Sequence, residues 1–401
     1  DLENFSEGLY DLAYTGITSA IQNGGVDSQG FALAADIALR LDSLNKANEY
    51  LKKALEIDES NEEYRNRWNK LDTLNQNLKE AKRKFDSGLI DEAIIDYENI
   101  IDNYPDFAKT YHLLGKIYYK EQDFDEAVYY YGKARNKNPY NESYSKEISN
   151  IAKKLAIEGN EIFRRKNYEG AIEKYNQSVR ISPNFTEGYY RAAKAYYLLG
   201  EFDFVKEKLD RVIQNDPSHI SSLKLYGDFE KKTGNLEVAV TYYKKAVENN
   251  NQFHIAHYAL GRAYYELQSN EEAITALNNA VIADPTYSKA YELRGIIYQS
   301  LNNMSEAVKN FELAIANNTK AYVVNFRLAS VYNEQKKHEM AKLAAEASID
   351  IKPKYAASWY ELGIAEKALG NRARAKIAFQ NAAKDKKWRK NADFEISNLY
   401  I

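Results

Sequence analysis

Few residues of this sequence could carry chemistry, and they are scattered. His254 and His257 are three positions apart, a spacing that can present two imidazoles to one metal ion. No third ligand of similar quality accompanies them. The sequence has no cysteine, no Gly-x-Ser-x-Gly, no phosphate-cradling glycine loop and no His-Glu-x-x-His. We therefore expect no catalytic activity, no metal and no cofactor, unless a catalytic domain precedes Asp1.

The charge balance bears on the class of partner. The 401 residues carry 55 Lys and Arg against 58 Asp and Glu, a formal net charge of -3, and the acidic excess lies in the first 60 residues. Nucleic-acid binding needs a concentrated basic field, which this balance disfavours. No apolar run reaches the roughly 18 to 20 residues that span a bilayer, so we expect no membrane insertion. The lack of cysteine and a first residue other than Met slightly favour a bacterial periplasmic or envelope protein over a cytoplasmic one.

One period organises the chain. The six prolines, from Pro105 to Pro353, are separated by 34, 44, 34, 68 and 68 residues. With proline at position 32, 34-residue repeats start at residues 28, 74, 108, 152, 186, 220, 254, 288, 322 and 356. The segments 62–73 and 142–151 are insertions, which we expect to lengthen the helix that follows each of them.

Other positions of the repeat indicate two helices in close contact. Position 8 is Gly or Ala in all ten repeats, position 20 is Ala in nine, and aromatic residues recur at positions 11 and 24. Two helices approach to about 8 Å only where small side chains meet. We therefore predict that Gly115 and Ala127 lie buried and close together where two helices cross. His257 occupies a position that is usually large and buried, which favours packing over metal binding.

This pattern resembles the tetratricopeptide repeat family, most clearly in Trp359-Leu362-Gly363-Ala375-Phe379-Ala382 and in Tyr111-Leu114-Gly115-Tyr118-Ala127-Tyr131-Ala134-Pro139. The resemblance covers residues 28–389. It implies an all-α fold, an α-solenoid of about ten helix-turn-helix units in a right-handed superhelix. We predict five parts: an incomplete first repeat over 1–27, repeats over 28–141, 142–287 and 288–389, and a terminal capping helix over 390–401 that includes Phe394, Leu399, Tyr400 and Ile401.

The resemblance also implies a concave groove lined by positions 2, 5, 9, 12 and 13 of the first helices. In the middle of the chain these positions are basic and aromatic, and Lys116, Lys194 and Arg262 would form a row. Such a surface suits an acidic extended segment or an amphipathic helix of a protein partner. The predicted peptide-binding residues are Lys116, Tyr119, Lys120, Asn160, Phe163, Arg164, Tyr190, Lys194, Tyr197, Lys224, Tyr258, Arg262 and Tyr265.

Towards the C-terminus the same positions become apolar, as at Phe326, Tyr360 and Ile364. Exposed apolar surface of this kind is usually covered, here either by a partner or by the chain's own tail. The favoured function is a non-enzymatic scaffold for protein–protein interaction. The alternative is a structural component of a larger bacterial envelope assembly, which binds through its convex face and through the insertions around Trp68 and Tyr144. A nucleic-acid-binding helical repeat is less favoured.

Overall fold

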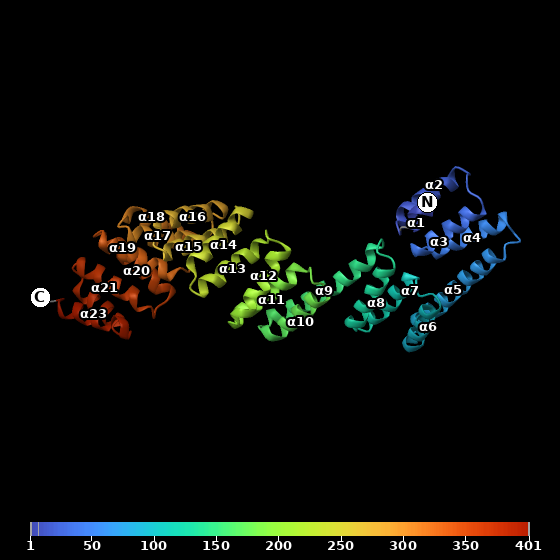
Figure 1. The fold of residues 1–401 in the computed structure, drawn as a ribbon. Coiled ribbons are helices and arrows are strands. Elements are labelled where there is room, and N and C mark those ends of the chain that lie inside the picture. The colour runs from blue at the N-terminus through green and yellow to red at the C-terminus, as the bar shows by residue number, and fades with distance from the viewer. Residues whose placement is uncertain (1, 7, 400–401) are drawn as a thin grey trace. The chain divides into compact units, whose positions relative to one another are not determined.

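The computed structural model describes residues 2–6 and 8–399, and all regular secondary structure in these residues is helical. The helices belong to two compact units, Asp1–Leu199 and Gly200–Ile401 (Figure 1). The division into five parts that the repeat frame predicts stays a prediction. The predicted capping residues Tyr400 and Ile401 lie outside the described residues. None of the described helices is long and apolar enough to cross a bilayer.

The first unit contains α1 (Leu2–Ser6), α2 (Tyr10–Gln22), α3 (Ser28–Arg40), α4 (Leu44–Ile57), α5 (Glu62–Asp86), α6 (Ile90–Asn103), α7 (Ala108–Lys120), α8 (Phe124–Lys137), α9 (Glu142–Arg164), α10 (Tyr168–Ile181) and α11 (Thr186–Leu199). The second contains α12 (Phe202–Asn215), α13 (Ile220–Lys232), α14 (Leu236–Asn249), α15 (His254–Glu266), α16 (Asn270–Ala283), α17 (Ser288–Ser300), α18 (Met304–Asn317), α19 (Tyr322–Glu334), α20 (His338–Ile351), α21 (Ala356–Ala368), α22 (Arg372–Ala382) and α23 (Lys386–Ser397).

Consecutive helices pack as pairs. In five of these pairs a glycine of the first helix meets an aromatic ring of the second, and in the α15–α16 pair Gly261 meets Leu277 instead. Gly115 of α7 and Ala127 of α8 are both buried. A Cβ placed on Gly115 would lie 2.7 Å from Tyr131 Cδ1 and 3.2 Å from the Ala127 carbonyl oxygen. Gly227 has the same relation to Tyr243 in the second unit. The predicted crossing is therefore confirmed.

The turn inside every helix pair has the same backbone conformation. In all ten repeats, position 15 has a positive φ, and at six of them, such as Asp42 with φ 59° and Asn302 with φ 58°, the residue is not glycine. The next backbone N–H then donates to the carbonyl five residues earlier, as from Ser43 to Ala38 at 2.8 Å and from Asn303 to Tyr298 at 2.8 Å. This is the Schellman arrangement, which satisfies the last carbonyls of a helix. The repeat frame is thus fixed by backbone geometry as well as by side chains.

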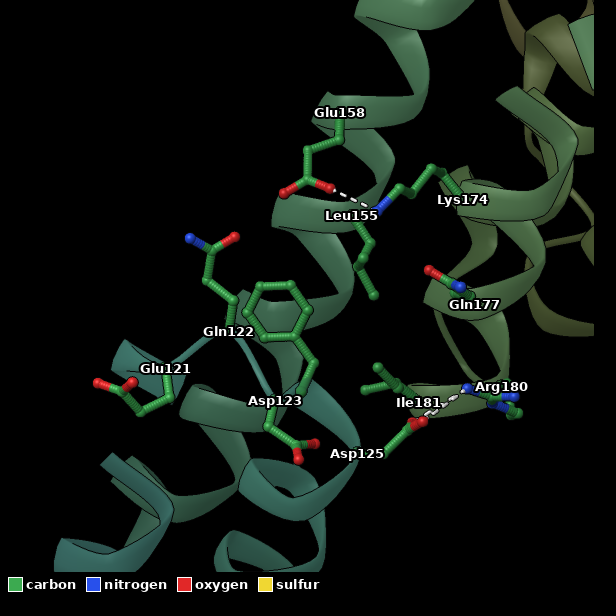
Figure 2. Close-up of a pocket in the computed structure, with 11 residues that line it drawn as sticks. Glu121, Gln122, Asp123, Asp125, Leu155, Glu158, Lys174, Gln177, Arg180 and Ile181 are labelled. Carbon is green, nitrogen blue, oxygen red and sulfur yellow. Dashed lines mark hydrogen bonds and ion pairs between the residues drawn. The ribbon is translucent and has the colours of Figure 1, made fainter. Parts of the chain in front are cut away.

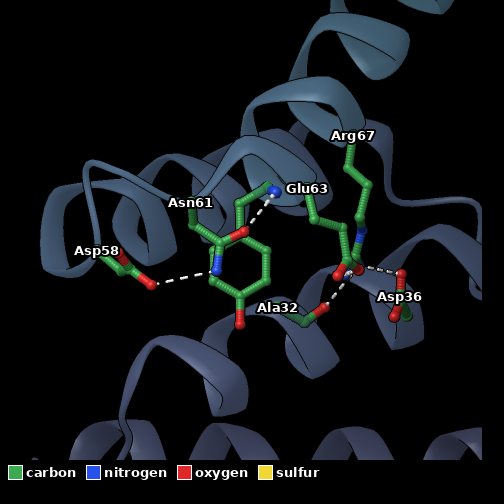
Figure 3. A network of polar contacts seen from close by, with 7 residues as sticks. Ala32, Asp36, Asp58, Asn61, Glu63 and Arg67 are labelled. Atoms are coloured by element: carbon green, nitrogen blue, oxygen red, sulfur yellow. Dashed lines mark hydrogen bonds and ion pairs between the residues drawn. The ribbon is translucent and has the colours of Figure 1, made fainter.

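The first insertion joins α5 to the first repeat (Figure 3). Asn61 caps α5 by accepting from the Tyr64 N–H at 3.1 Å. One turn further on, Arg67 forms an ion pair with Asp36 of α3 and donates to the Ala32 carbonyl at 3.1 Å. Burial raises the pKa of Asp36, against the lowering effect of the Arg67 charge. The extra turns of α5 therefore hold α3 in place.

The second insertion reaches the same repeat through Asp42, in the α3–α4 turn. Asp42 Oδ2 accepts from Asn138 Nδ2 at 2.6 Å and from the Tyr144 hydroxyl at 2.7 Å, and Oδ1 accepts from the Lys109 N–H at 3.0 Å. Lys109 is the second residue of α7, whose own N-cap residue, Phe107, makes no side-chain cap. Asp42 thus caps α7 from another repeat, where the positive end of the helix favours a carboxylate.

The C-terminal cap differs from the prediction in its start and in its buried face. α23 begins at Lys386, four residues before the predicted boundary. Ala392 and Leu399 are buried, but Phe394 is 65% exposed, so the prediction that Phe394 covers the last repeat is wrong. Trp388 provides the cover instead. It lies before the predicted start of the cap and packs on Tyr360 of α21 with ring centroids 4.9 Å apart.

Two glycines of one helix pair test the crossing. Gly115→Ala forces its new methyl group into the buried Tyr131 ring and should lower the free energy of unfolding by about 1 to 3 kcal/mol. Gly132→Ala, in α8, meets nothing within 4 Å and should raise it by up to about 1 kcal/mol through helix propensity. Urea titration of both variants measures the difference. Equal effects of the two substitutions would contradict the crossing.

Asp42→Ala should loosen the first repeat. It leaves the buried Tyr144 hydroxyl and Asn138 amide without their acceptor, at a cost of roughly 1 to 3 kcal/mol for each group. Hydrogen exchange measured by mass spectrometry should then rise in α3 and α4. Asn302→Ala is the control. Asn302 occupies the same left-handed turn position, but its side chain forms no long-range hydrogen bond with any described residue. Unchanged exchange in α3 and α4 would show that Asp42 does not hold this repeat.

Candidate binding surface

The predicted groove residues of the first unit lie on three first helices whose side chains meet in turn. Lys116, Tyr119 and Lys120 are on α7, Asn160, Phe163 and Arg164 on α9, and Tyr190, Lys194 and Tyr197 on α11. We call the surface that these nine residues form the basic-aromatic face.

Cations pack on rings across this face. Lys194 Nζ of α11 lies 5.7 Å from the centre of the Phe163 ring of α9. Lys154 Nζ of α9 lies 5.0 Å from the centre of the Tyr119 ring of α7. Lys120 Nζ lies 4.6 Å from the centre of the Phe85 ring of α5. These contacts link neighbouring helices and hold the lysine stems. Lys154 was not predicted, because it occupies position 3 of its repeat, outside the phases that the family resemblance assigns to the groove.

The cations of the face are not neutralised by neighbouring carboxylates. Lys116, Lys120, Arg164 and Lys194 are exposed, and none of them forms an ion pair within the part of the chain that the structure describes. An unpaired cation keeps its field for an incoming ligand, whereas a paired one is largely cancelled. The first unit therefore presents uncompensated positive charge.

The predicted cations of the second unit differ in this respect. Lys224 pairs with Asp228 at 2.5 Å, and Asp228 also accepts from the Tyr243 hydroxyl at 2.8 Å. Arg262 pairs with Glu266 at 3.1 Å. The remaining predicted residues there, Tyr258 and Tyr265 on α15, are half-buried. Arg262 is thus unlike Lys116 and Lys194, since its charge is already compensated within its own helix.

Asn160 already has partners inside the first unit. Its Oδ1 accepts from the Tyr175 hydroxyl at 2.9 Å and from Arg191 Nη1. These bonds join α9 to α10 and α11. The Asn160 side chain therefore positions the helices that carry Phe163 and Lys194.

His112 lies behind the face, between α7 and α9. Its ring centroid is 4.9 Å from that of Tyr144 and 5.5 Å from that of Tyr131. Burial, followed by the charges of Lys116 and Lys109, lowers the pKa of His112 to about 4. The imidazole is therefore neutral at pH 7 and adds no charge to the face.

A polar cleft of about 500 Å³ opens beside the second insertion, between the α7–α8 turn, α9 and α10 (Figure 2). Two ion pairs cross it, Lys174–Glu158 at 2.9 Å and Arg180–Asp125 at 3.0 Å. Its other charged side chains are acidic, so it does not suit an anionic ligand. The described residues also contain no cluster of three or more His, Asp or Glu that could hold a metal ion.

The apolar C-terminal positions are covered in part by the chain itself. Trp388 of α23 packs on Tyr360, and its ring centroid is 6.4 Å from that of Phe326 of α19. Ile364 belongs to the same cluster. The sequence left open whether a partner or the chain's own tail covers these positions. In the structure, the tail covers part of them.

The two aromatic residues that the structural-component alternative would use differ in burial. Tyr144 is 1% exposed and bonded to Asp42, and Trp68 is half-buried against the core of the first unit. Tyr144 is therefore wrong as an anchor for that alternative, whereas the role of Trp68 stays a prediction.

Helix pairs that share one turn geometry, and that leave one face of each first helix exposed, are typical of a helical-repeat protein. Models of the tetratricopeptide repeat match residues 29–61, 108–141, 230–288, 288–320 and 322–355, and a TPR repeat model matches residues 159–200. Together they cover more than half of the chain, and the chain belongs to the tetratricopeptide repeat family.

The chain resembles several larger proteins over part of its length. A TPR repeat-containing protein of Methanocaldococcus jannaschii is 25% identical over 55% of this chain and 42% of its own length. The Hsp70-Hsp90 organising protein of Plasmodium falciparum is 25% identical over 40% of this chain and 28% of its own. The chain thus spans less than half of these relatives. The C-terminal part of a TPR protein from Cytophaga hutchinsonii, 19% identical, superimposes with a TM-score of 0.51 over 59% of this chain and 98% of that one, which shows the fold.

Acid should destabilise the protein through His112. Its pKa is about 4 when folded and about 6.5 when unfolded, so the unfolded state binds the proton more tightly. The folded state therefore keeps its full stability above pH 6.5. Its free energy of unfolding falls as the pH drops towards 4, with a slope of up to about 1.4 kcal/mol per pH unit. Glu147, 3.9 Å away, opposes this effect. His112→Phe should flatten the pH dependence of the unfolding free energy in this window, and an unchanged profile would contradict the assignment.

Proposed function

We propose that the chain is a non-enzymatic interaction scaffold whose first unit binds an acidic extended segment of a partner protein on the basic-aromatic face. The observation that carries this proposal is the set of four exposed cations, Lys116, Lys120, Arg164 and Lys194, without carboxylate partners among the described residues. Peptide carboxylates form charge-assisted hydrogen bonds with such groups.

Three further observations support a protein segment as the ligand. The rings of Tyr119 and Phe163 lie among the cations and add apolar contact area. The whole chain carries a net charge of -3, which disfavours nucleic acid. The Plasmodium falciparum relative is an Hsp70-Hsp90 organising protein, which agrees with a scaffold role. An amphipathic helix is the second candidate ligand, favoured by the same alternation of rings and cations.

Binding should depend on the unpaired cations and not on the paired ones. The probe is a fluorescein-labelled polyglutamate peptide, and fluorescence anisotropy measures its dissociation constant at several salt concentrations. Lys116→Gln with Lys194→Gln should weaken binding about tenfold, or roughly 0.7 kcal/mol per charge, and should flatten the salt dependence.

The matched control removes the same number of charges from the second unit. Lys224→Gln with Arg262→Gln should change the affinity less than about twofold, because those cations are already compensated by Asp228 and Glu266. Equal losses in the two double variants would contradict the role of the face, as would the absence of binding at low salt.

A further inference from the structure

A cavity of about 690 Å³ lies where the first repeat docks on later ones. It opens between the α3–α4 turn, the start of α4, the C-terminal half of α5 and the start of α7. A volume of this size is typical of sites that enclose a large side chain or a small ligand. Its lining residues are Asp42, Ser43, Leu44, Asn45, Lys46, Asn75, Leu78, Lys79, Lys82, Phe107, Lys109 and Leu113.

The cavity depends on the long-range contacts of Asp42. Leu44 and Lys46 come from the first repeat, Phe107 ends the second repeat, and Lys109 comes from the third. The bond from the Lys109 N–H to Asp42 Oδ1, at 3.0 Å, holds these two sides together. The site therefore does not consist of neighbouring first helices alone, because it includes α4 and a turn from a non-adjacent repeat.

Its floor and rim have different chemistry. Leu44 and Phe107 are buried, and Leu78 and Leu113 are half-buried, so the floor is apolar.

Lysines predominate at the rim of the cavity. Lys82 pairs with Asp86, whereas Lys46, Lys79 and Lys109 are exposed and form no ion pair with any described residue.

The only carboxylate of the lining is already engaged. Asp42 accepts three hydrogen bonds, from Lys109, Asn138 and Tyr144, so its oxygens are held within the first unit, and its single charge is outnumbered by the lysines of the rim. An apolar floor with a rim of unpaired lysines suits an apolar side chain flanked by carboxylates.

The cavity is continuous with the basic-aromatic face along α7. Lys109, Leu113, Lys116 and Lys120 follow one another at i, i+4, i+7 and i+11 and therefore lie on one side of the helix. A segment bound across Lys116 and Lys120 thus reaches the cavity by following this helix.

We propose that this cavity binds one large apolar side chain of the acidic partner segment, with Lys46, Lys79 and Lys109 contacting the carboxylates on either side of it. The proposal rests on the proposed function and adds a sequence preference to it. Lys46 and Lys79 carry no signal in the repeat pattern, which is why the sequence did not reveal them.

The test uses two labelled peptides of equal charge and the full chain. Both are short polyglutamates, one with a central phenylalanine and the other with a central alanine. The phenylalanine peptide should bind about tenfold more tightly, because it buries a ring that the alanine peptide lacks. Asn45→Trp, which fills the cavity from an exposed position, should remove this preference and leave the affinity for the alanine peptide within about twofold.

Two lysines of α4 serve as a matched pair of variants. Lys46→Glu should weaken the phenylalanine peptide severalfold more than Lys52→Glu, an exposed substitution outside the cavity. Circular dichroism establishes that each variant is folded.

The possible failures are distinguishable. Equal affinity of the two peptides for the native protein would overturn the cavity proposal and leave the proposed function intact. No binding of either peptide at low salt would overturn both proposals. If single-stranded DNA of the same charge binds as tightly as the phenylalanine peptide, and Asn45→Trp changes neither affinity, the site is only an electrostatic surface and the proposal is wrong.

Discussion

The close contact between a small residue of one helix and a side chain of the next, an aromatic ring in five of the helix pairs, is the constraint on which the rest of the molecule depends. At Gly115 a single added methyl group would overlap the Tyr131 ring, so the two helices can pack only in one register. That register fixes which positions of the first helix are buried and which remain exposed. The exposed ones carry Lys116 and Lys120. The binding surface is therefore a consequence of how the pairs pack, because no separate element builds it.

The two insertions change this regular arrangement, and both of them hold the first repeat. Arg67, in the first, holds α3, and Tyr144, in the second, holds the turn after α3. Lengthened helices in a repeat array could serve a partner, but these are used inside the chain. Their effect is to bring the α3–α4 turn and the start of α4 to the start of α7, whereas a regular array would place only α5, from the next repeat, beside α4. The basic cavity exists because of this departure.

The sequence predicted the helix pairs, their crossing and the lengthened helices, because each leaves a periodic signal. It also contained a signal that was missed: Lys224 and Arg262 each have a carboxylate four residues later, the spacing of an intrahelical ion pair. The role of Asp42 left no such signal, since its partners lie 67, 96 and 102 residues away and follow no repeat. Phe394 was misassigned because its face was judged without knowing where α23 begins, and each residue turns a helix by about 100°.

The cap that Asp42 places on α7 also has a consequence for the order of assembly at the ribosome. The chain is made from its N-terminal end, so the α3–α4 turn is complete long before its acceptor bonds can form. Tyr144 follows Asp42 by 102 residues, a delay of roughly 5 to 20 s at usual translation rates of about 5 to 20 residues per second. During that interval the first repeat has its own helices but not its docking partners, and its apolar surface is available to chaperones. Its final position is thus set by residues translated well after it.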